Sequence, residues 1–338
     1  MKKPERQPRY AARFGVLAAG FLLLLLASAL LGRFRLTLAE LASLLGLSDA
    51  PVRDGASNVL FQIRLPRIGA AVLIGAALSA AGASDQGLFR YPMVSPDILG
   101  ASTAAGFGAA LGILLGAGYF GISATAFVFG LLAVLLSYLV SRFARANETL
   151  ALILSGMVIS SLFSAGTSFI KLVADTQEQL PAITYWLMGS LASVKQRDLL
   201  FLTVPVLLGM LPLLLLRWRI NLLTLGEDEA KSLGVNTTVL RLAVILCATL
   251  LTASSVAVCG MIGWVGLIVP HICRMLFGYD YRRLLPACAL FGAAFLLLVD
   301  DIARLATAGE IPIGILTAFV GAPLFLWLIL TGGGRRND

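Results

Sequence analysis

The sequence predicts an all-α fold, a polytopic transmembrane helix bundle of about ten spans per subunit with both termini in the cytoplasm. Of its 338 residues, 59% are hydrophobic and 13% are charged, whereas soluble domains carry about 25% charged residues. The chain contains uncharged apolar runs, and a helix needs about 20 such residues to cross the hydrocarbon core. Because these runs are continuously apolar and do not alternate, they favour helices over a barrel.

The apolar runs place the expected spans along the chain. The first, at residues 14–32, carries no charge along its whole length. The others are expected at 68–84, 98–118, 119–141, 149–170, 199–216, 239–258, 262–277, 284–303 and 311–330. The run at 262–277 is short and contains Pro270 and His271. The hydrophilic stretches, of which 33–67, 171–198 and 217–238 are the largest, are too short for a soluble domain, so residues 1–338 are expected to form one membrane domain.

The first run also has features of a signal peptide. Basic residues precede it, and Ala27-Ser28-Ala29 resembles a signal-peptidase site. The apolar run continues past this tripeptide and is longer than the apolar region of a usual signal peptide, so we expect an uncleaved span. With a cytoplasmic N-terminus, most of the 26 Lys and Arg residues fall in cytoplasmic segments, as the positive-inside rule requires. The net charge of +8 therefore indicates membrane orientation and not nucleic acid binding.

The sequence contains few of the residue patterns that enzyme active sites require. The four cysteines lie within or beside spans without forming a C-x-x-C pair, and His271 is the only histidine, so neither a metal site nor histidine catalysis is expected. No serine lies in a G-x-S-x-G turn. Ionisable residues within the spans are scarce apart from Asp300 and Asp301. That scarcity disfavours a proton- or sodium-driven carrier, which needs carboxylates inside the membrane.

The segment TLGEDEAKSLGV (224–235) resembles a phosphate-binding loop but fails as one. Ala230 stands where the second glycine is required, and residues 227–229 would set three carboxylates against a polyanion. Two interpretations stay open for this polar segment. It is either a simple connecting loop or a short amphipathic helix, set off by Gly226 and Gly234, that docks in a groove of a partner protein.

Five motifs along the chain resemble one known family. They are RLPRIGAAVLIGAALSAAGASDQGLFRYPMVSPDILGAS (64–102), YWLMGSL (185–191), LGEDEAKSLGV (225–235), GMIGWVGLIVPHICRMLFGYDYRRLLP (260–286) and DIARLATAGEIPIGILTAFVGAPLF (301–325). Their content and order resemble the permease subunits of binding-protein-dependent ABC importers for iron-siderophores, haem and cobalamin, the type II importers. The resemblance extends over almost the whole chain.

The resemblance implies a transport assembly in a prokaryotic cytoplasmic (inner) membrane. The chain would form a homodimer in the lipid bilayer, with two ATP-binding cassette ATPase subunits that bind ATP and Mg, and a periplasmic or lipid-anchored substrate-binding protein outside. The chain itself would need no cofactor and bind no nucleic acid. The expected substrate is a metal chelate, a ferric siderophore before haem or cobalamin. Similar members carry molybdate-type oxyanions, which stay an alternative. A gradient-driven secondary transporter is a further alternative, and a membrane-embedded enzyme has no polar catalytic cluster to support it.

The resemblance also assigns the coupling and docking residues. The ATPase-coupling segment would span about 222–236, with contacts from Leu225, Gly226, Glu227, Asp228, Ala230, Leu233 and Gly234. The exposed arginines Arg64, Arg67 and Arg304 would pair with carboxylates of the binding protein. The alternatives are that these arginines anchor at lipid headgroups or that Arg304 pairs with Asp300, one turn earlier.

A cytoplasmic gate is implied by the same resemblance. Tyr91, Met93 and Thr149 would line the inner constriction. Tyr91 stands where the family has a small amide, so the exit would have a different shape. The alternative is a packed loop held by Pro92 and Pro96. Glu310 is expected to cap or kink the entry to the last span.

Overall fold

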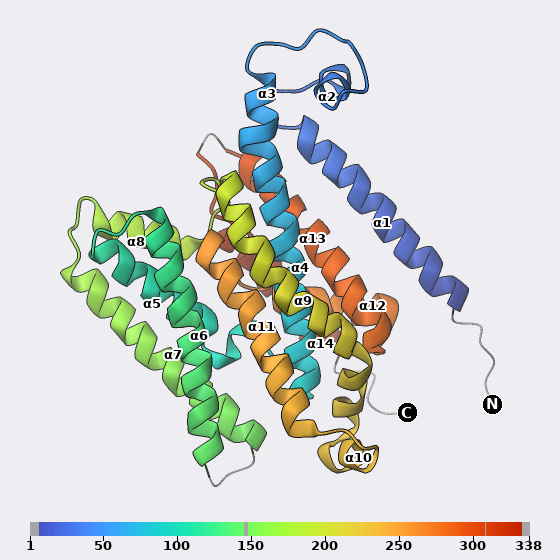
Figure 1. Cartoon of the computed structure of the whole chain (residues 1–338), viewed down its shortest axis with the longest axis vertical. Coiled ribbons are helices and arrows are strands. Elements are labelled where there is room, and N and C mark those ends of the chain that lie inside the picture. The colour runs from blue at the N-terminus through green and yellow to red at the C-terminus, as the bar shows by residue number, and fades with distance from the viewer. Residues whose placement is uncertain (1–6, 145–147, 308, 333–338) are drawn as a thin grey trace.

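Apolar helices dominate the computed structural model, which describes residues 7–144, 148–307 and 309–332. Each predicted run coincides with one long or medium helix (Figure 1). These helices are α1 (Gln7–Leu30), α4 (Leu65–Leu88), α5 (Ala101–Leu114), α6 (Tyr119–Phe143), α7 (Glu148–Val173), α9 (Gln196–Leu225), α11 (Thr237–Cys259), α12 (Val265–Phe277), α13 (Tyr281–Leu305) and α14 (Ile313–Gly332). The all-α prediction is confirmed. Within the described ranges, seven helical segments are long and apolar enough to cross a membrane, and α5, α12 and α14 are shorter.

Several short helical elements were not predicted. They are α2 (Leu38–Leu44), α3 (Ala56–Asn58), the π-helical η1 (Val59–Arg64), the 3-10 turn η2 (Pro96–Leu99) and α8 (Gln179–Met188). A further short helix, α10 (Glu227–Ser232), lies where the sequence allowed one between Gly226 and Gly234. α3 and η1 extend α4 outward, so one continuous helix runs over 56–88. α8 lies within the stretch 171–198, in which no helix was expected.

α4 is the central helix of the bundle. It contacts α9, α11, α12 and α13, and nearly all of its residues are buried. A Cβ atom at Gly75 would overlap the carbonyl oxygen of Gly292 on α13, and one at Gly82 would overlap that of Gly266 on α12. Glycine therefore lets these backbones approach closely, as small residues do in membrane bundles. The side chain of Ser79 adds a hydrogen bond to the Cys288 carbonyl at 2.7 Å.

A second group of helices packs beside this centre. α5, α6, α7 and α8 lie together on the left of Figure 1 and contact the central group through α11. Three aromatic rings fill the space between α5, α6 and α7. The ring of Phe107 lies 5.1 Å from that of Phe129 and 5.3 Å from that of Phe163, measured between centroids. These contacts hold the second group together, and the contacts of α11 with α5 and α6 join it to the central group.

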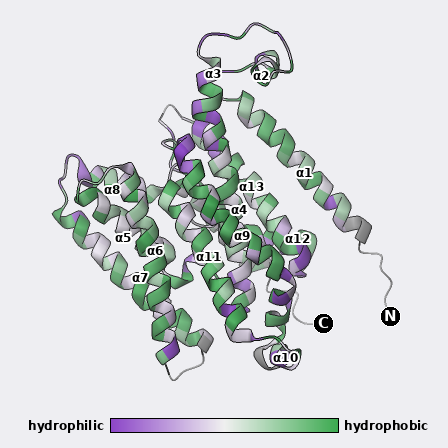
Figure 2. Ribbon diagram, viewed as in Figure 1, coloured by the Kyte–Doolittle hydropathy of each residue, from purple (hydrophilic) through white to green (hydrophobic). Residues whose placement is uncertain are grey.

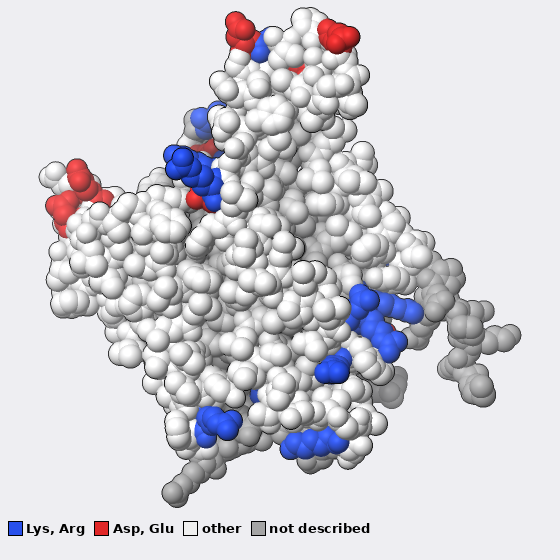
Figure 3. Space-filling view, in the orientation of Figure 1, with Lys and Arg blue, Asp and Glu red and all other residues white. Residues whose placement is uncertain are grey.

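The two ends of the bundle differ in charge. Hydrophobic residues dominate the helices, and hydrophilic ones concentrate at their ends (Figure 2). On the face shown in Figure 3, the coloured charges at the end that carries α10 are Lys and Arg, whereas the visible Asp and Glu lie toward the opposite end, together with further Lys and Arg. This distribution agrees with the predicted orientation, in which α10 is cytoplasmic. Below, the α10 end is called the inner end and the α2 end the outer end.

A polar cap covers the outer end beyond α1. Thr37 begins α2, and its side chain accepts from the Glu40 amide at 3.2 Å while the Glu40 carboxylate accepts from the Thr37 amide at 2.9 Å. Arg53 donates to the same carboxylate from Nη2 at 2.8 Å. The Arg53 guanidinium, followed by the Thr37 amide, holds the pKa of Glu40 well below its usual range. These bonds order the long connection between α1 and α3.

The close approach of α4 and α13 leads to a stability prediction. Gly75→Ala should destabilise the bundle by about 1–3 kcal/mol, because the added methyl group must push two backbones apart. The measurement is the apparent unfolding temperature of the purified chain in detergent. Gly20→Ala on α1, where a Cβ atom meets nothing within 4 Å, is the matched control. Equal unfolding temperatures for the two variants would show that the α4–α13 contact is not tight.

Candidate functional site

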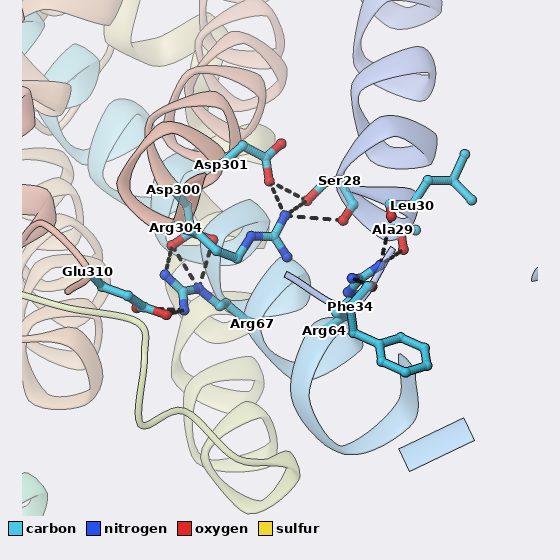
Figure 4. Close-up of polar contacts among 10 residues, drawn as sticks. All are labelled: Ser28, Ala29, Leu30, Phe34, Arg64, Arg67, Asp300, Asp301, Arg304 and Glu310. Carbon is cyan, nitrogen blue, oxygen red and sulfur yellow. Dashed lines mark hydrogen bonds and ion pairs between the residues drawn. The ribbon is translucent and has the colours of Figure 1, made fainter. Parts of the chain in front are cut away.

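An outer cluster of charged residues joins α1, α4 and α13 (Figure 4). Arg67 on α4 lies between two carboxylates. Its Nε is 2.9 Å from both Asp300 carboxylate oxygens, and its Nη1 is 2.9 and 2.8 Å from those of Glu310. Glu310 lies in the connection between α13 and α14. One guanidinium therefore fixes two separate segments to the outer part of α4.

The other two arginines of the outer cluster hold the end of α1. Arg304 pairs with Asp301, and its Nη2 donates to the Ser28 carbonyl at 3.2 Å. The Ser28 hydroxyl donates to Asp301 at 2.7 Å. Arg64 donates to the Leu30 carbonyl at 3.0 Å and also to carbonyls of Ala29 and Phe34. The bonds to Ser28, Ala29 and Leu30 satisfy carbonyls in the last turn of α1. They join the first predicted span to the bundle.

The outer cluster corrects three expectations. Arg64, Arg67 and Arg304 were expected to be exposed, but they are only 3%, 5% and 8% exposed because they are turned into the bundle. Arg304 pairs with Asp301 and not with Asp300, whose carboxylate is engaged by Arg67. Glu310 was expected to cap or kink the last span, but it pairs with Arg67. Docking of a binding protein on these arginines stays a prediction.

The predicted coupling segment is a compact turn at the inner end. α9 ends at Leu225, and α10 begins after Gly226, whose φ of 144° disfavours a side chain. A Cβ atom there would also overlap the Glu229 carboxylate. Gly234, with a φ of 78°, ends the turn before α11. The segment is thus a separate short helix, as the docking interpretation expects, although its contact with a partner is untested.

The side chains of the coupling segment divide into two groups. Leu225 and Leu233 are exposed, whereas Ala230 is fully buried against the chain itself. Ala230 was expected to offer a contact to a partner, so that part of the expectation is corrected. The side chains of Glu227 and Asp228 lie outside the described residues.

The predicted gate residues lie at the inner end on two elements. Tyr91 and Met93 belong to the loop between α4 and η2, and Tyr91 is exposed. Thr149 lies in the first turn of α7. α7 approaches this region further along, where Gly156 packs against the backbone of Ile98 in η2. Arg90, which precedes Tyr91, has a φ of 52°, a left-handed conformation that is uncommon outside glycine.

Two of the sequence motifs meet in the middle of the bundle. α8 ends at Gly189, whose carbonyl accepts from the Ile313 amide at 2.9 Å, while the Ser190 amide donates to the Cys259 carbonyl at 2.8 Å. Both α11 and α8 therefore stop where α14 starts, next to the irregular connection 260–264. Interrupted helices of this kind line binding sites in membrane transporters.

A cavity of about 680 Å³ lies at this junction. Every residue that lines it is uncharged, and they come from the end of α8, the connection 260–264 and α14. Trp264 forms part of its wall and has a φ of 70°, which is uncommon for a large side chain. Its ring lies 6.1 Å from that of Phe325 on α14, between centroids. The sequence motifs around Gly189 and Trp264 could have indicated this junction, but their spacing along the chain does not show that they meet.

Comparison with known proteins identifies the family. The model of the FecCD transport family matches residues 20–331. The chain belongs to the FecCD transport family. A molybdate import system permease protein of Haemophilus influenzae is 44% identical over 329 residues, covering 94% of this chain and 97% of that protein. A probable iron chelatin transport system permease protein of Helicobacter pylori is 41% identical, covering 82% of this chain and 84% of its own.

Structural comparison agrees with this assignment. An inward-facing structure described as a metal-chelate type ABC transporter has a TM-score of 0.86 and 42% sequence identity, covering 95% of this chain and 99% of that one. This FecCD chain is therefore the permease of an ABC importer and a multi-pass protein of the cytoplasmic membrane. Its relatives are named as permease proteins, so it is a transport subunit and not an enzyme.

The helices of this FecCD chain bury more charged side chains than the sequence predicted. Asp85 and Arg67 lie within α4 and Arg274 within α12, all three buried. The predicted span 68–84 had left out Arg67 and Asp85, whereas Arg274 lay inside the predicted span 262–277. The expectation that ionisable residues within spans are scarce apart from Asp300 and Asp301 is therefore wrong. Among the described residues, no three His, Cys, Asp or Glu side chains gather as metal ligands would.

The outer cluster leads to a test by charge removal. Asp300→Ala should destabilise the FecCD chain by about 3–5 kcal/mol, because it leaves the buried Arg67 guanidinium without its main partner. Thermal unfolding in detergent measures the effect, with the exposed Asp49→Ala as the control. A double variant that carries both Asp300→Ala and Arg67→Met should recover part of the lost stability. If it does not, the Arg67–Asp300 pair does not account for the loss.

Proposed function

We propose that the chain carries a metal chelate, a ferric siderophore in the first place, along the apolar cavity at the α8–α14 junction. The observation that carries the proposal is the lining of that cavity, which includes Met188, Met261, Trp264 and Phe319 and no charged residue. A chelated metal is wrapped by organic ligand and presents carbon surface, which an apolar wall accommodates without specific bonds. The wall thus suits passage of a bulky chelate.

The same lining argues against a small dianion. An oxyanion that leaves water must receive hydrogen bonds or a cation, since burial of an unpaired charge is costly. Molybdate is nevertheless the second candidate, because the molybdate permease of Haemophilus influenzae is 44% identical to this chain. Haem and cobalamin share the chelate chemistry of the first candidate and rank after a siderophore.

A second copy of the chain would complete the pathway. The cavity opens beside α14, and that helix presents Phe319, Val320 and Leu326 at the surface. Apolar side chains at the mouth of a cavity would be covered by a homodimer partner or by lipid. We assign this face to the homodimer, because a half-pathway on each copy would then form one closed passage.

Two further partners follow from the two ends of the bundle. At the inner end, exposed Leu225 and Leu233 flank α10 and would enter a groove of an ATPase subunit that binds ATP and Mg. At the outer end, a periplasmic or lipid-anchored binding protein would deliver the substrate. Arg64, Arg67 and Arg304 could take part in docking only by exchanging their intrachain bonds.

Reconstitution tests the substrate. The complex of permease, ATPase and binding protein in liposomes should hydrolyse ATP faster when the binding protein carries a ferric siderophore, and should accumulate the chelate inside. Molybdate-loaded binding protein should leave the basal rate unchanged. Stimulation by molybdate alone would replace the chelate proposal by the second candidate.

The coupling assignment is tested by a change of charge at α10. Leu233→Asp should reduce co-purification of the ATPase and lower uptake at least tenfold, because a carboxylate must then be desolvated in an apolar groove. Leu47→Asp is the matched control, since Leu47 is exposed at the outer end. Retention of both ATPase binding and uptake by Leu233→Asp would refute the role of α10.

A further inference from the structure

A series of polar contacts runs from the coupling segment toward the gate loop. It starts at Asn221, one turn before the end of α9. Asn221 donates from Nδ2 to the Asp280 carboxylate at 2.8 Å and accepts from the Tyr281 amide at 2.9 Å. Both bonds are made to the corner that begins α13. The side chain of one residue thus joins the end of α9 to that corner.

Two further contacts strengthen the same junction. Arg217 donates to the Arg282 carbonyl at 3.3 Å. The Arg282 guanidinium in turn lies 3.8 Å from the ring centroid of Trp218, in cation–π geometry. Since the contacts come from three positions within about one turn of α9, at 217, 218 and 221, turning of the corner relative to the end of α9 would break them.

Tyr281 carries the series from this corner to α4. Its side chain is buried, and its hydroxyl donates to the Ala83 carbonyl at 3.0 Å. A Cβ atom at Gly87 would lie 2.7 Å from the same hydroxyl oxygen. The ring therefore fills the space that Gly87 leaves open. A movement of the corner must displace the last turns of α4 or break this packing.

Gln86 and Arg274 hold the gate loop at the end of the series. Gln86, adjacent to Gly87, donates from Nε2 to the Val94 carbonyl at 3.0 Å. Arg274 on α12 donates from Nη2 to the Gln86 side-chain oxygen at 2.5 Å and to the Pro92 carbonyl at 3.3 Å. Both side chains are buried. Their hydrogen bonds fix the backbone on both sides of Met93, in the loop that starts at Arg90, whose backbone is in the left-handed region.

We propose that Asn221, Tyr281, Gln86 and Arg274 are positioning residues that transmit displacement of α10 to the loop carrying Tyr91 and Met93. The proposal rests on the proposed coupling role of α10. Several bonds in the series end on a backbone atom, so displacement moves chain segments and not only side chains. The contacts of these four residues follow one another from the proposed site of ATPase docking to the predicted inner constriction.

The first test removes one hydroxyl group. Tyr281→Phe keeps the ring but deletes the hydrogen bond to the Ala83 carbonyl. Tyr279→Phe is the control, because Tyr279 is two residues away and its side chain is exposed. The reconstituted complex is assayed for ferric siderophore taken up per ATP hydrolysed. Tyr281→Phe should keep stimulated hydrolysis within about twofold and lower uptake per ATP at least fivefold. An equal fall in hydrolysis and uptake, or no change, would reject the linkage.

The second test asks whether the contacts act in series. Asn221→Ala should also lower uptake per ATP, and adding Tyr281→Phe should lower it no further, because a series is already broken at one link. Multiplication of the two effects would instead show independent local roles and overturn the proposal. Absence of ATP-driven uptake by the unaltered complex would reject the proposed function, which is a distinguishable result.

The third test reads the loop directly and needs no transport. Tyr91→Cys introduces an exposed thiol into the gate loop, and the four native cysteines are buried or half-buried. Its labelling rate by a membrane-impermeant maleimide in inside-out vesicles should change severalfold when ATP is added to the complex. Tyr281→Phe should abolish that change while leaving the rate without ATP the same. A nucleotide response that persists in Tyr281→Phe would contradict the linkage.

Discussion

The contact of α4 with α12 and α13 is the constraint on which the other helices depend. Lipid tails are as apolar as the helices, so helices in a membrane associate through close van der Waals packing and not through burial from water. The glycine pairs Gly75–Gly292 and Gly82–Gly266 provide such packing, because each carbonyl occupies the volume of a missing side chain. Some of the remaining helices contact this tightly joined group directly, and others contact it through those helices. α1 lies on its outside, against α13.

Polar contacts then fix α4 at both of its ends. At the outer end, Arg67 reaches Asp300 and Glu310, and at the inner end Gln86 meets Arg274. Charged groups within a bundle are costly unless paired, so these pairs also determine which helices can be neighbours. α4, α12 and α13 are therefore expected to move as one body during transport. Relative motion is expected at the irregular connection 260–264, whereas the gate loop, which Gln86 and Arg274 hold, is expected to move with α4 and α12.

The sequence was sufficient to predict the helical spans but not which helices contact one another. Continuous apolar runs predict spans because one side of each helix meets lipid and the other meets the core, and both favour the same residues. The end of α4 was misplaced at residue 84, because Asp85 and Gln86 look like loop residues unless their buried surroundings are known. α8 was missed because its ten residues are too few to form a membrane-length run.

The functional residues show the same limit. The sequence brought Arg64, Arg67, Asp300 and Arg304 to one end of the bundle, and the structure agrees. It did not predict which side chains pair, because Arg67 and Asp300 are 233 positions apart. The coupling segment was recognised as a short helix between glycines, since Gly226 and Gly234 mark its limits locally. The cavity at Trp264 depends on three distant segments, so no local pattern could indicate its shape.

The π-helical turn η1 has a consequence for how the outer cap can vary between related chains. A π turn holds one more residue than an α turn, and η1 ends at Arg64. Because the wider turn accommodates this extra residue within itself, loss of one residue from Val59–Arg64 would restore α geometry and leave the helix on either side facing nearly the same way. α3 and the connection that carries Arg53 would keep their direction, while Arg67 and the bundle below stayed in place. The turn thus lets related chains differ by one residue at this point without redirecting the outer surface or rebuilding the transmembrane body.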